Sequence, residues 1–253
     1  MFDFTPYAGL PKTAEEAKKQ CLLANRILAN ENVLDGYGHV SVRNPEAVGT
    51  FFQARAVAPE FVTIDDILEI DLRGNVVTET KFRPYGERVI HSAVLADRPD
   101  VFAVCHGHPH EVVALSAVGM PLRSIGQFCG MFWKPLPIFD AYSPGSGMLI
   151  SESQDGERLS RALGGARGIV MRGHGFTMTG NSVQQAVMNS IFFRDNAKMQ
   201  LLLLPFPGAE VKYLSEDEGR SAEKTQYSDI SLGRCWDYWI ARAKKAMPDL
   251  QEF

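Results

Sequence analysis

The strongest constraint on this chain is a ten-residue segment, 101–110, that reads VFAVCHGHPH. Four apolar residues of strand-like character and a cysteine lead into histidines at positions 106, 108 and 110. Alternate side chains of a strand point to the same face, so we expect His106 and His108 to direct two imidazoles at one point. Pro109 has no N–H group and disfavours further strand pairing, which places His110 on a following helix. Two imidazoles at a strand end predict a divalent-metal site.

A third imidazole is available from His174, which lies between two glycines directly after a predicted strand at 167–171. Glycines admit unusual turns and a close approach of the backbone, so they allow the ring to be presented at a strand end. A turn histidine by itself is common. Together with the pair at 106 and 108, however, it completes the three protein ligands of a catalytic metal site, which leaves one position open for water or substrate.

Glu87 is the acidic residue best placed to join these histidines. It lies on a predicted helix at 85–96, one turn before His91 and on the same face of that helix. This helix immediately precedes the histidine strand. We expect Glu87 to be either a fourth metal ligand, displaced when substrate binds, or the acid–base group beside the metal.

A second informative strand is predicted at 39–43. Its polar residues alternate with valines, so His39, Ser41 and Arg43 share one face and the valines share the other. Two interpretations follow from this pattern. The polar face lines a cavity, or the strand is a surface edge strand.

Strands and helices interleave along the whole chain. Beyond those already named, strands are expected at 51–58, 67–72, 76–78, 135–139 and 176–179, and helices at 13–32, 109–118, 155–163, 182–204 and around Trp236, with a polar segment at 215–228 before the last helix. Several strand pairs are joined by hairpin-sized turns. We therefore expect an α/β protein whose mixed, mainly antiparallel sheet is covered by helices on both faces, in one domain.

Composition excludes several classes of partner. The net charge of −4 without a basic block argues against nucleic acid. No apolar run approaches the roughly 20 residues that span a bilayer, and the N-terminus lacks the features of a signal peptide. The four scattered cysteines lack a C-x-x-C spacing and read as reduced thiols in a cytoplasmic protein. Cys105 falls on the strand face opposite His106, so we expect it in the core rather than at the metal.

From about residue 14 to 204 the sequence resembles the class II aldolase/adducin family. The resemblance is carried by four motifs in family order: Gly38-x-x-Ser41-x-Arg43, Glu87-x-x-x-His91, Arg98-Pro-Asp100 leading into His106-x-His108-Pro109, and Arg172-Gly-His174-Gly175. It implies a three-layer α/β/α fold around a central, mainly antiparallel sheet. It also implies one divalent metal ion per subunit, held by His106, His108 and His174, with Glu87 in acid–base work and metal contact.

The resemblance further implies a cyclic homotetramer with active sites at subunit boundaries. A neighbouring subunit is then expected to contribute an acid, often a tyrosine, and Tyr142 is our candidate for that group. On this view residues 1–253 form a single family domain, with a C-terminal extension from about 205 to 253.

The chain departs from the sugar-phosphate aldolases of the family where they bind phosphate. Those enzymes have an asparagine after the glycine, a T-P-S-G-like loop and a Ser-Ser before the glutamate; this chain has His39, Ala58-Pro59-Glu60 and Tyr85-Gly86. A carboxylate repels a phosphate dianion and the tyrosine occupies its space, so we expect a substrate that is not a phosphate ester. Four aromatic residues either favour a flat organic ligand near the site or belong to the core: Tyr85, Phe128, Phe132 and Trp133.

The Gly-His-Val-Ser-Val-Arg pattern resembles the family branch of decarboxylases that act on hydroxylated aromatic or pyridine dicarboxylic acids. A hydroxyl ortho to a carboxylate can chelate a metal, and the metal and His39 would hold the enolate-like charge that develops as CO2 leaves. Arg43 is our candidate clamp for the remaining carboxylate, and Ser41 and Tyr85 are expected to contact the substrate.

We therefore predict a metal-dependent carbon–carbon lyase, a decarboxylase of a small carboxylic acid. Three alternatives stay open: an aldolase acting on an unphosphorylated hydroxy-carbonyl compound, an iron(II) oxygenase, and an adducin-like interaction module, although such modules lose the metal histidines. Three imidazoles favour zinc on affinity grounds, and manganese, iron or cobalt also suit three histidines with a carboxylate.

Overall fold

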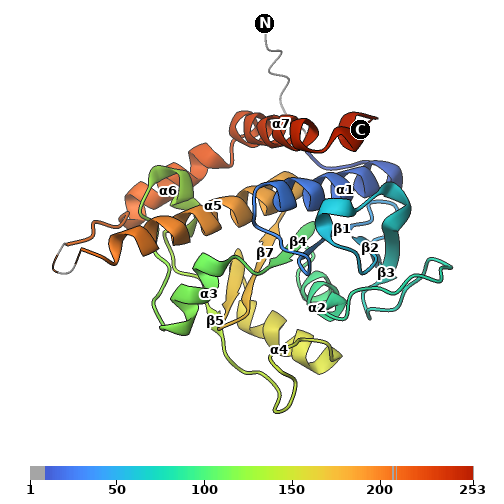
Figure 1. Cartoon of the computed structure of the whole chain (residues 1–253), viewed down its shortest axis with the longest axis horizontal. Coiled ribbons are helices and arrows are strands. Elements are labelled where there is room, and N and C mark those ends of the chain that lie inside the picture. Colours follow the sequence, from blue (N-terminus) through green and yellow to red (C-terminus); the bar gives the residue numbers. More distant parts are fainter. Residues whose placement is uncertain (1–8, 207, 209, 253) are drawn as a thin grey trace, which may run out of the picture.

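The computed structural model describes residues 9–206, 208 and 210–252 (Figure 1). Its centre is a seven-stranded sheet in the order β3-β2-β1-β4-β7-β6-β5. The strands are β1 (His39–Arg43), β2 (Thr50–Ala54), β3 (Ile67–Asp71), β4 (Ala103–Gly107), β5 (Ile138–Phe139), β6 (Gly168–Met171) and β7 (Gly175–Gly180). Neighbouring strands are antiparallel except β5 and β6, which are parallel. The expected mixed, mainly antiparallel sheet is confirmed.

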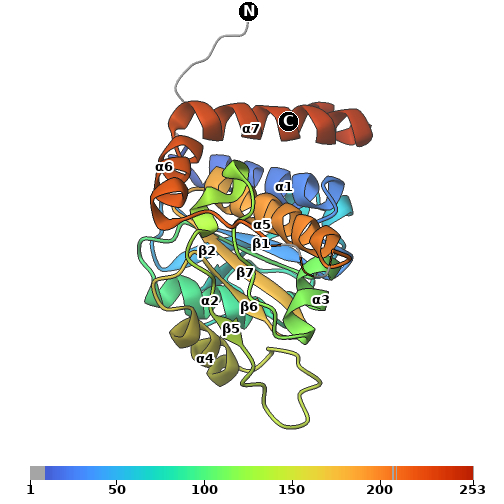
Figure 2. The ribbon, with the colours of Figure 1, turned by 90° about the vertical axis from the view of Figure 1, so that its left-hand side faces the viewer.

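Helices cover both faces of this sheet (Figures 1 and 2). On one face lie α1 (Ala14–Asn30) and α5 (Val183–Leu203), with α7 (Asp229–Ala246) packed outside them; on the other lie α2 (Arg88–Asp97) and α4 (Ser153–Leu163). The remaining helices are α3 (His110–Ala117), α6 (Glu216–Gln226) and four short 3-10 helices, η1 (Pro59–Phe61), η2 (Ile64–Asp66), η3 (Gln127–Phe132) and η4 (Pro248–Glu252). The α/β class and the three layers are confirmed.

Each face of the sheet has its own apolar cluster. Val40, Val42 and Cys105 lie in the cluster under α1 and α5, whereas Val104 lies in the cluster under α2 and α4. Because strand side chains alternate, His39, Ser41 and His106 point to the α2 side. Cys105 is fully buried in the core, as its strand parity indicates.

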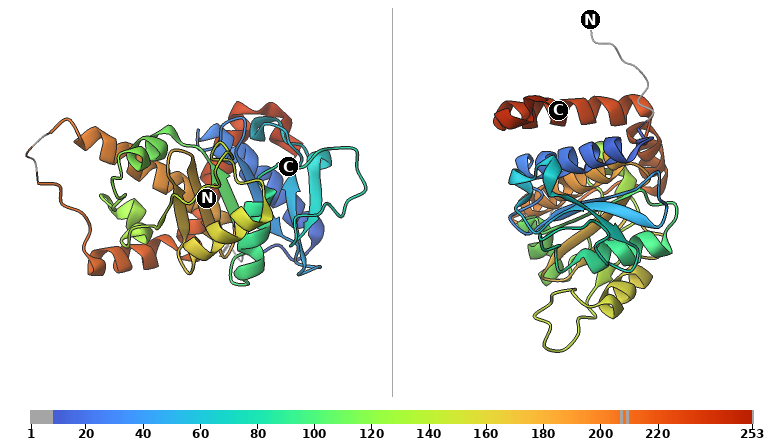
Figure 3. Two further views of the ribbon diagram at one scale, coloured as in Figure 1. Left: turned by 90° about the horizontal axis from the view of Figure 1, so that it is seen from below. Right: turned by 90° about the vertical axis from the view of Figure 1, so that its right-hand side faces the viewer.

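Two features of the local sequence fix the helices that position the site. Thr13 and Glu16 form a reciprocal capping box at the start of α1. Gly156 allows α4 to lie directly against α2, because a Cβ atom there would stand 2.5 Å from the Val89 carbonyl oxygen. Figure 3 shows these two helices side by side beneath the sheet.

Several predicted boundaries are wrong. The strand predicted at 51–58 ends at Ala54, and 76–78 contributes only an isolated bridge between Ile70 and Val76. The polar segment at 215–228 contains α6, which starts at a capping box of Ser215 with Glu218. The helix predicted at 85–96 begins at Arg88, so that Glu87 is its N-cap residue. Among the described helices, none is long and apolar enough to span a bilayer.

Candidate metal centre

Three histidines and one glutamate converge at the end of the central strands. His106 belongs to β4 and His108 lies just beyond its end; Glu87 caps α2 from the facing layer. His174 sits in the tight turn between β6 and β7, which Gly173 makes possible with a φ of 66°. One ligand atom from each of the four side chains lies within 4.8 Å of the other three. The structure thus brings together the four residues that the sequence nominates for the metal.

The separations of the ligand atoms fit a single cation. Nε2 of His106 lies 3.1 Å from Nε2 of His108 and 3.4 Å from Oε2 of Glu87. Nε2 of His174 lies 3.5 Å from Oε1 of Glu87. Ligands at about 2.0–2.1 Å from a tetrahedral ion stand about 3.3 Å apart. The four groups are therefore already spaced as a metal would require, and their chemistry of three imidazoles and one carboxylate suits zinc, manganese, iron or cobalt.

The other ring nitrogen of each histidine is engaged by a partner that fixes its tautomer. Nδ1 of His108 lies 3.0 Å from Oδ1 of Asp35, and Nδ1 of His174 lies 2.9 Å from the Met148 carbonyl oxygen. Nδ1 of His106 lies 3.3 Å from Oγ1 of Thr177, whose own hydroxyl points at a methionine sulfur and so leaves its oxygen free to accept. With a cation bound, each Nδ1 would therefore carry the proton and each Nε2 would present a lone pair, the arrangement found around bound metals.

The charges of the cluster suit a cation. Burial opposes ionisation of Glu87, but the charges and hydrogen bonds of His106 and His174 outweigh it and hold the pKa of the carboxyl well below its usual range. Burial lowers the pKa of His106. Burial acts in the same direction on His174, yet its hydrogen bond to Glu87 prevails and raises its pKa. A cation bound here competes with a proton for that ring.

His39 is a further buried polar residue beside the four ligands. Its ring centroid lies 5.2 Å from that of His106 and 4.4 Å from that of Tyr85. Nδ1 of His39 lies 2.7 Å from Nε2 of His91. Burial, followed by the charges of the neighbouring histidines, lowers the pKa of His39 well below its usual value, so this ring is neutral. The polar face of β1 lines the buried site and is not a surface edge.

Two of the residues expected to bind substrate have structural roles instead. Ser41 is fully buried and its Oγ lies 2.6 Å from Nδ1 of His91, so its hydroxyl is bonded to a histidine of the protein. Arg43 stands four residues, roughly 13 Å, along β1 from His39. Its guanidinium donates to four backbone carbonyls, those of Val48, Leu95, Arg98 and Val101. The expectation that it clamps a carboxylate is corrected.

The two candidate tyrosines lie beside the cluster. The ring of Tyr85 contacts His39, but its hydroxyl donates to the Val57 carbonyl, so the hydroxyl is committed to the protein. Tyr142 stacks on His174 of its own chain, with ring centroids 6.3 Å apart, and its hydroxyl donates to the Arg172 carbonyl at 3.1 Å. That Tyr142 acts on a neighbouring subunit stays a prediction. Burial raises its pKa, so its hydroxyl stays protonated.

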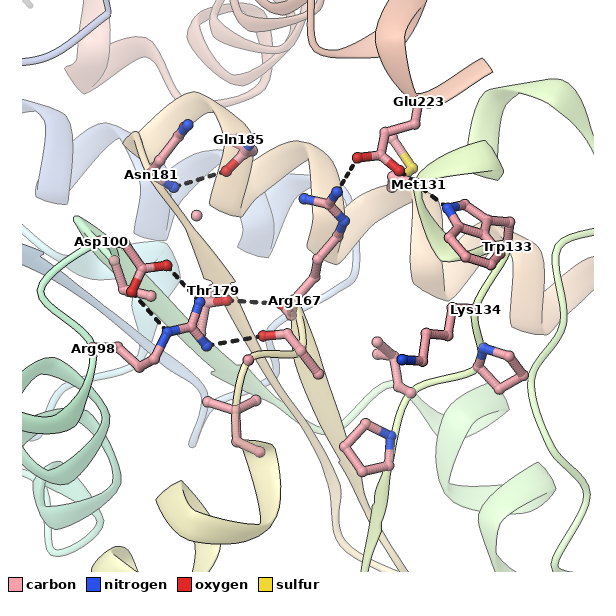
Figure 4. A pocket seen from close by; sticks show the side chains of 18 of the residues that line it. Arg98, Asp100, Met131, Trp133, Lys134, Arg167, Thr179, Asn181, Gln185 and Glu223 are labelled. Carbon is pink, nitrogen blue, oxygen red and sulfur yellow. Dashed lines mark hydrogen bonds and ion pairs between the residues drawn. The ribbon is translucent and has the colours of Figure 1, made fainter. Parts of the chain in front are cut away.

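The aromatic residues that follow in the sequence lie elsewhere. Phe132 is buried in the α1/α5 core, with Phe128 packed against that core. Trp133 lines a separate cavity of about 920 Å3 (Figure 4). That cavity lies near the start of β4 and the end of β7, the opposite end of the sheet from His106, and its arginines are paired with acids such as Glu223. Of the two interpretations, the core therefore holds for Phe128 and Phe132. Among the four aromatic residues named from the sequence, Tyr85 is the one that lies beside His39.

Comparison with known proteins gives consistent results. Residues 19–201 match the family described as the class II aldolase and adducin N-terminal domain. The chain is 30% identical over 238 residues to the protein named decarboxylase tropJ of Talaromyces stipitatus, covering 85% of this chain and 89% of that relative. It is 30% identical over 217 residues to a 3,4-dihydroxyphthalate decarboxylase of Arthrobacter keyseri, covering 79% and 83%.

A solved structure supports the fold. The L-fuculose 1-phosphate aldolase of Glaciozyma antarctica PI12 superposes with a TM-score of 0.78 at 22% identity, covering 93% of this chain and 91% of that one. At this identity the likeness shows the three-layer architecture and no more.

Proposed function

The chain belongs to the class II aldolase and adducin family, and from that membership we propose that it is a metal-dependent carbon–carbon lyase that decarboxylates a non-phosphorylated, hydroxylated aromatic or heteroaromatic carboxylic acid. The observation that carries the proposal is the convergence of three imidazole Nε2 atoms and the Glu87 carboxylate, with the neutral ring of His39 beside them. Two relatives at 30% identity that are named as decarboxylases support the choice of reaction.

The metal would be held by His106, His108 and His174, with Glu87 as a fourth ligand or as the adjacent acid–base group. When bound, such an ion acts as a Lewis acid toward the carboxylate and ortho-hydroxyl oxygens of the substrate. The outer partners Asp35 and Met148 keep two of the imidazoles in the orientation and tautomer that this requires.

The chain's own residues then serve the bond cleavage. A proton first adds to the ring carbon that carries the carboxylate, which makes that carbon tetrahedral. The carbon–carboxylate bond then breaks, CO2 leaves, and its electron pair returns to the ring and to the ring hydroxyl oxygen. His39 donates a hydrogen bond to the oxygen where that charge develops. The proton comes from an acid, which the family resemblance implies is supplied by a neighbouring subunit. Tyr142 is our candidate for that acid, because burial raises its pKa and its hydroxyl stays protonated.

We propose zinc or manganese as the ion, on the preference of imidazole and carboxylate ligands. We propose a homotetramer with sites at subunit boundaries, as the family resemblance implies, and a cytoplasmic location, in line with the four free cysteines. We also propose a single domain in which residues after about 205 form an extension that packs on the family core through α7.

The test is direct. Protein loaded with zinc or manganese is incubated with 3,4-dihydroxyphthalate, other hydroxyphthalates and hydroxypyridine dicarboxylic acids, and CO2 and product are measured by mass spectrometry. We expect loss of CO2 from at least one acid and none with His106→Ala. Release of an aldehyde from hydroxy-carbonyl compounds, with every acid unchanged, would establish the aldolase instead. Metal-dependent oxygen uptake would identify an oxygenase.

A further inference from the structure

We propose that Ser41 and His91 are positioning residues that set the tautomer of His39, so that His39 presents an Nε2–H donor to the substrate. The inference rests on the proposed function for its catalytic meaning, but its structural content is independent of any activity. It gives a purpose to two buried polar residues that do not belong to the metal cluster.

The geometry is a continuous line of short hydrogen bonds. Oγ of Ser41 lies 2.6 Å from Nδ1 of His91, and Nε2 of His91 lies 2.7 Å from Nδ1 of His39. All three side chains are at most 1% exposed. Ser41 and His39 are alternate residues of β1 and therefore share a face, while His91 reaches them from α2. Both ring nitrogens of His91 are thus engaged by β1.

The direction of hydrogen-bond donation along this line follows from Ser41. A buried hydroxyl needs an acceptor for its proton. Among the described residues, the acceptor that the Ser41 hydroxyl reaches is Nδ1 of His91. If Nδ1 accepts, a neutral His91 carries its proton on Nε2 and donates it to Nδ1 of His39. The reverse direction would leave the Ser41 proton buried without an acceptor.

His39 is the end of this line. Its Nδ1 accepts from His91, and the Gln53 amide nitrogen lies 3.4 Å from the same atom. The single proton of the neutral ring is therefore on Nε2, which none of the hydrogen bonds formed by the described residues uses. The ring centroid of His39 lies 5.2 Å from that of His106, so the ring that carries this donor lies beside the metal cluster.

A neutral donor suits this position better than a charged one. An imidazolium this close to a bound dication would be repelled, whereas a neutral N–H can stabilise charge that develops on a substrate oxygen without that cost. Burial lowers the pKa of His91 to about 3 and so supports neutrality along the line. Fixing the proton in advance means that the donor does not have to reorganise during the reaction.

Neutron diffraction from crystals of the zinc-loaded full chain tests the proton positions without any substrate. We expect deuterium on Oγ of Ser41 pointing at His91, on Nε2 of His91, and on Nε2 of His39. Deuterium on Nδ1 of His39 would overturn the inference. Either result is obtained whether or not the protein proves to be a decarboxylase, so failure of the inference and failure of the proposed function are distinguishable.

Variants test the functional part on the acid that turns over. Ser41→Ala removes the first donor, and Ser92→Ala is its matched control, because Ser92 is also buried but its hydroxyl bonds only to backbone carbonyls of its own helix. We expect kcat to fall about 10-fold or more for Ser41→Ala, with KM changed less than about threefold, and both constants to stay near wild type for Ser92→Ala. Equal kcat values in Ser41→Ala and wild type would overturn the functional role.

His91 offers a second comparison. In His91→Gln the amide retains an oxygen that accepts from Ser41 and a nitrogen that donates to His39, whereas His91→Phe keeps only the ring volume. We expect kcat for the Gln variant to exceed that of the Phe variant at least about fivefold, since second partners of this kind contribute 10- to 100-fold. If the two variants are equally impaired at equal metal content and melting temperature, His91 merely fills space.

Discussion

Nδ1 of His108 lies 3.0 Å from Oδ1 of Asp35, a residue 73 positions earlier in the chain. The same carboxylate oxygen accepts from the backbone N–H groups of Tyr37 and Gly38, so one acid organises both the loop that leads into β1 and a metal ligand. Burial acts against its ionisation, but the hydrogen bonds from His108 and from these backbone groups lower the pKa of Asp35. A carboxylate–histidine pair of this kind raises the basicity of the ligand nitrogen.

Asp35→Asn is therefore expected to weaken metal binding. The amide oxygen can still accept from Tyr37 and Gly38, so the loop is preserved and only the charge behind His108 is lost. We expect the Kd for zinc, measured by competition with a chromogenic chelator, to rise about 10-fold. Asp100→Asn, at an exposed aspartate paired with Arg98 beyond the other end of β4, should leave the Kd unchanged. Equal affinities for wild type and Asp35→Asn would show that the pair does not act on the metal.

Glu87→Gln removes the negative charge at the centre of the site but keeps nearly the same side-chain shape. The glutamine oxygen can still accept from the Ile150 N–H, which lies 3.1 Å from Oε1 of Glu87, so the fold is preserved. The anionic ligand or base is lost, and we expect kcat to fall at least 100-fold. Metal content is measured by mass spectrometry on the same samples, with Glu152→Gln as an exposed control. A variant that keeps its metal and its rate would exclude Glu87 from the chemistry.

Removal of the metal should lower both activity and thermal stability. A ligand at 100 times its Kd stabilises the folded state by about 2.7 kcal/mol, which corresponds to a rise in Tm of roughly 5–10 °C for a chain of this length. We expect chelator-treated protein to melt lower by that amount and to recover when zinc or manganese is added. His174→Ala should show little of this metal-dependent shift, because it lacks one of the three imidazoles. An unchanged Tm in wild type would argue against a resident ion.

The metal residues were predictable from sequence because their signals are local. Because side chains alternate along a strand, the sequence alone predicts that His106 and His108 point the same way. The glycines on either side of His174 predict a turn. Their outer partners were not predictable. The strand order and the loop paths bring these partners to the imidazole rings, and no periodic sequence pattern predicts contacts at such separations. The partners are Asp35, Thr177 and Met148. The tight Asp-Gly-Tyr-Gly segment just before β1 was the one available hint for Asp35.

Strand alternation predicted the shared face of His39, Ser41 and Arg43 but not what that face meets. The pattern predicts to which face of the sheet a side chain points, but not which groups it meets there. The bonds of Arg43 to backbone carbonyls and of Ser41 to His91 therefore could not be predicted from the sequence. The missed helix α6 is a different case. Its capping box, Ser215 with Glu218, was present in the sequence, and the polar composition of the segment concealed it.

Arg43→Ala tests the structural role of that guanidinium. The truncation leaves four carbonyls without their donor, the closest of which is the Leu95 carbonyl at 2.7 Å. We expect the free energy of unfolding, from urea titration, to fall by about 3 kcal/mol, with KM in the remaining folded protein within about twofold of wild type. Arg73→Ala, at an exposed turn, is the control. A raised KM at unchanged stability would restore the idea of a substrate clamp.

Asp66 provides a pH-dependent contribution to stability away from the site. Its Oδ2 accepts from the backbone and hydroxyl of Thr63 at 2.9 and 2.8 Å, and its Oδ1 from Nε of Arg55 at 2.6 Å. Burial alone would raise the pKa of this carboxyl, but the bonds from Thr63 and Arg55 prevail and lower it. A depressed folded-state pKa stabilises the protein above the unfolded value of about 3.9, and this stabilisation is lost as pH falls through the folded pKa.

Asp66→Asn should therefore cost stability at neutral pH and progressively less in acid. We expect urea titrations to give a difference from wild type of about 1 kcal/mol between pH 5 and 7, narrowing as pH falls below about 4. Asp65→Asn makes the same change of charge one residue earlier, at an exposed side chain, and should show neither the loss nor the narrowing. A difference that stays constant down to pH 3 would mean that the loss comes only from the poorer hydrogen bonds of the amide, and that the ionised form of Asp66 adds nothing to folding.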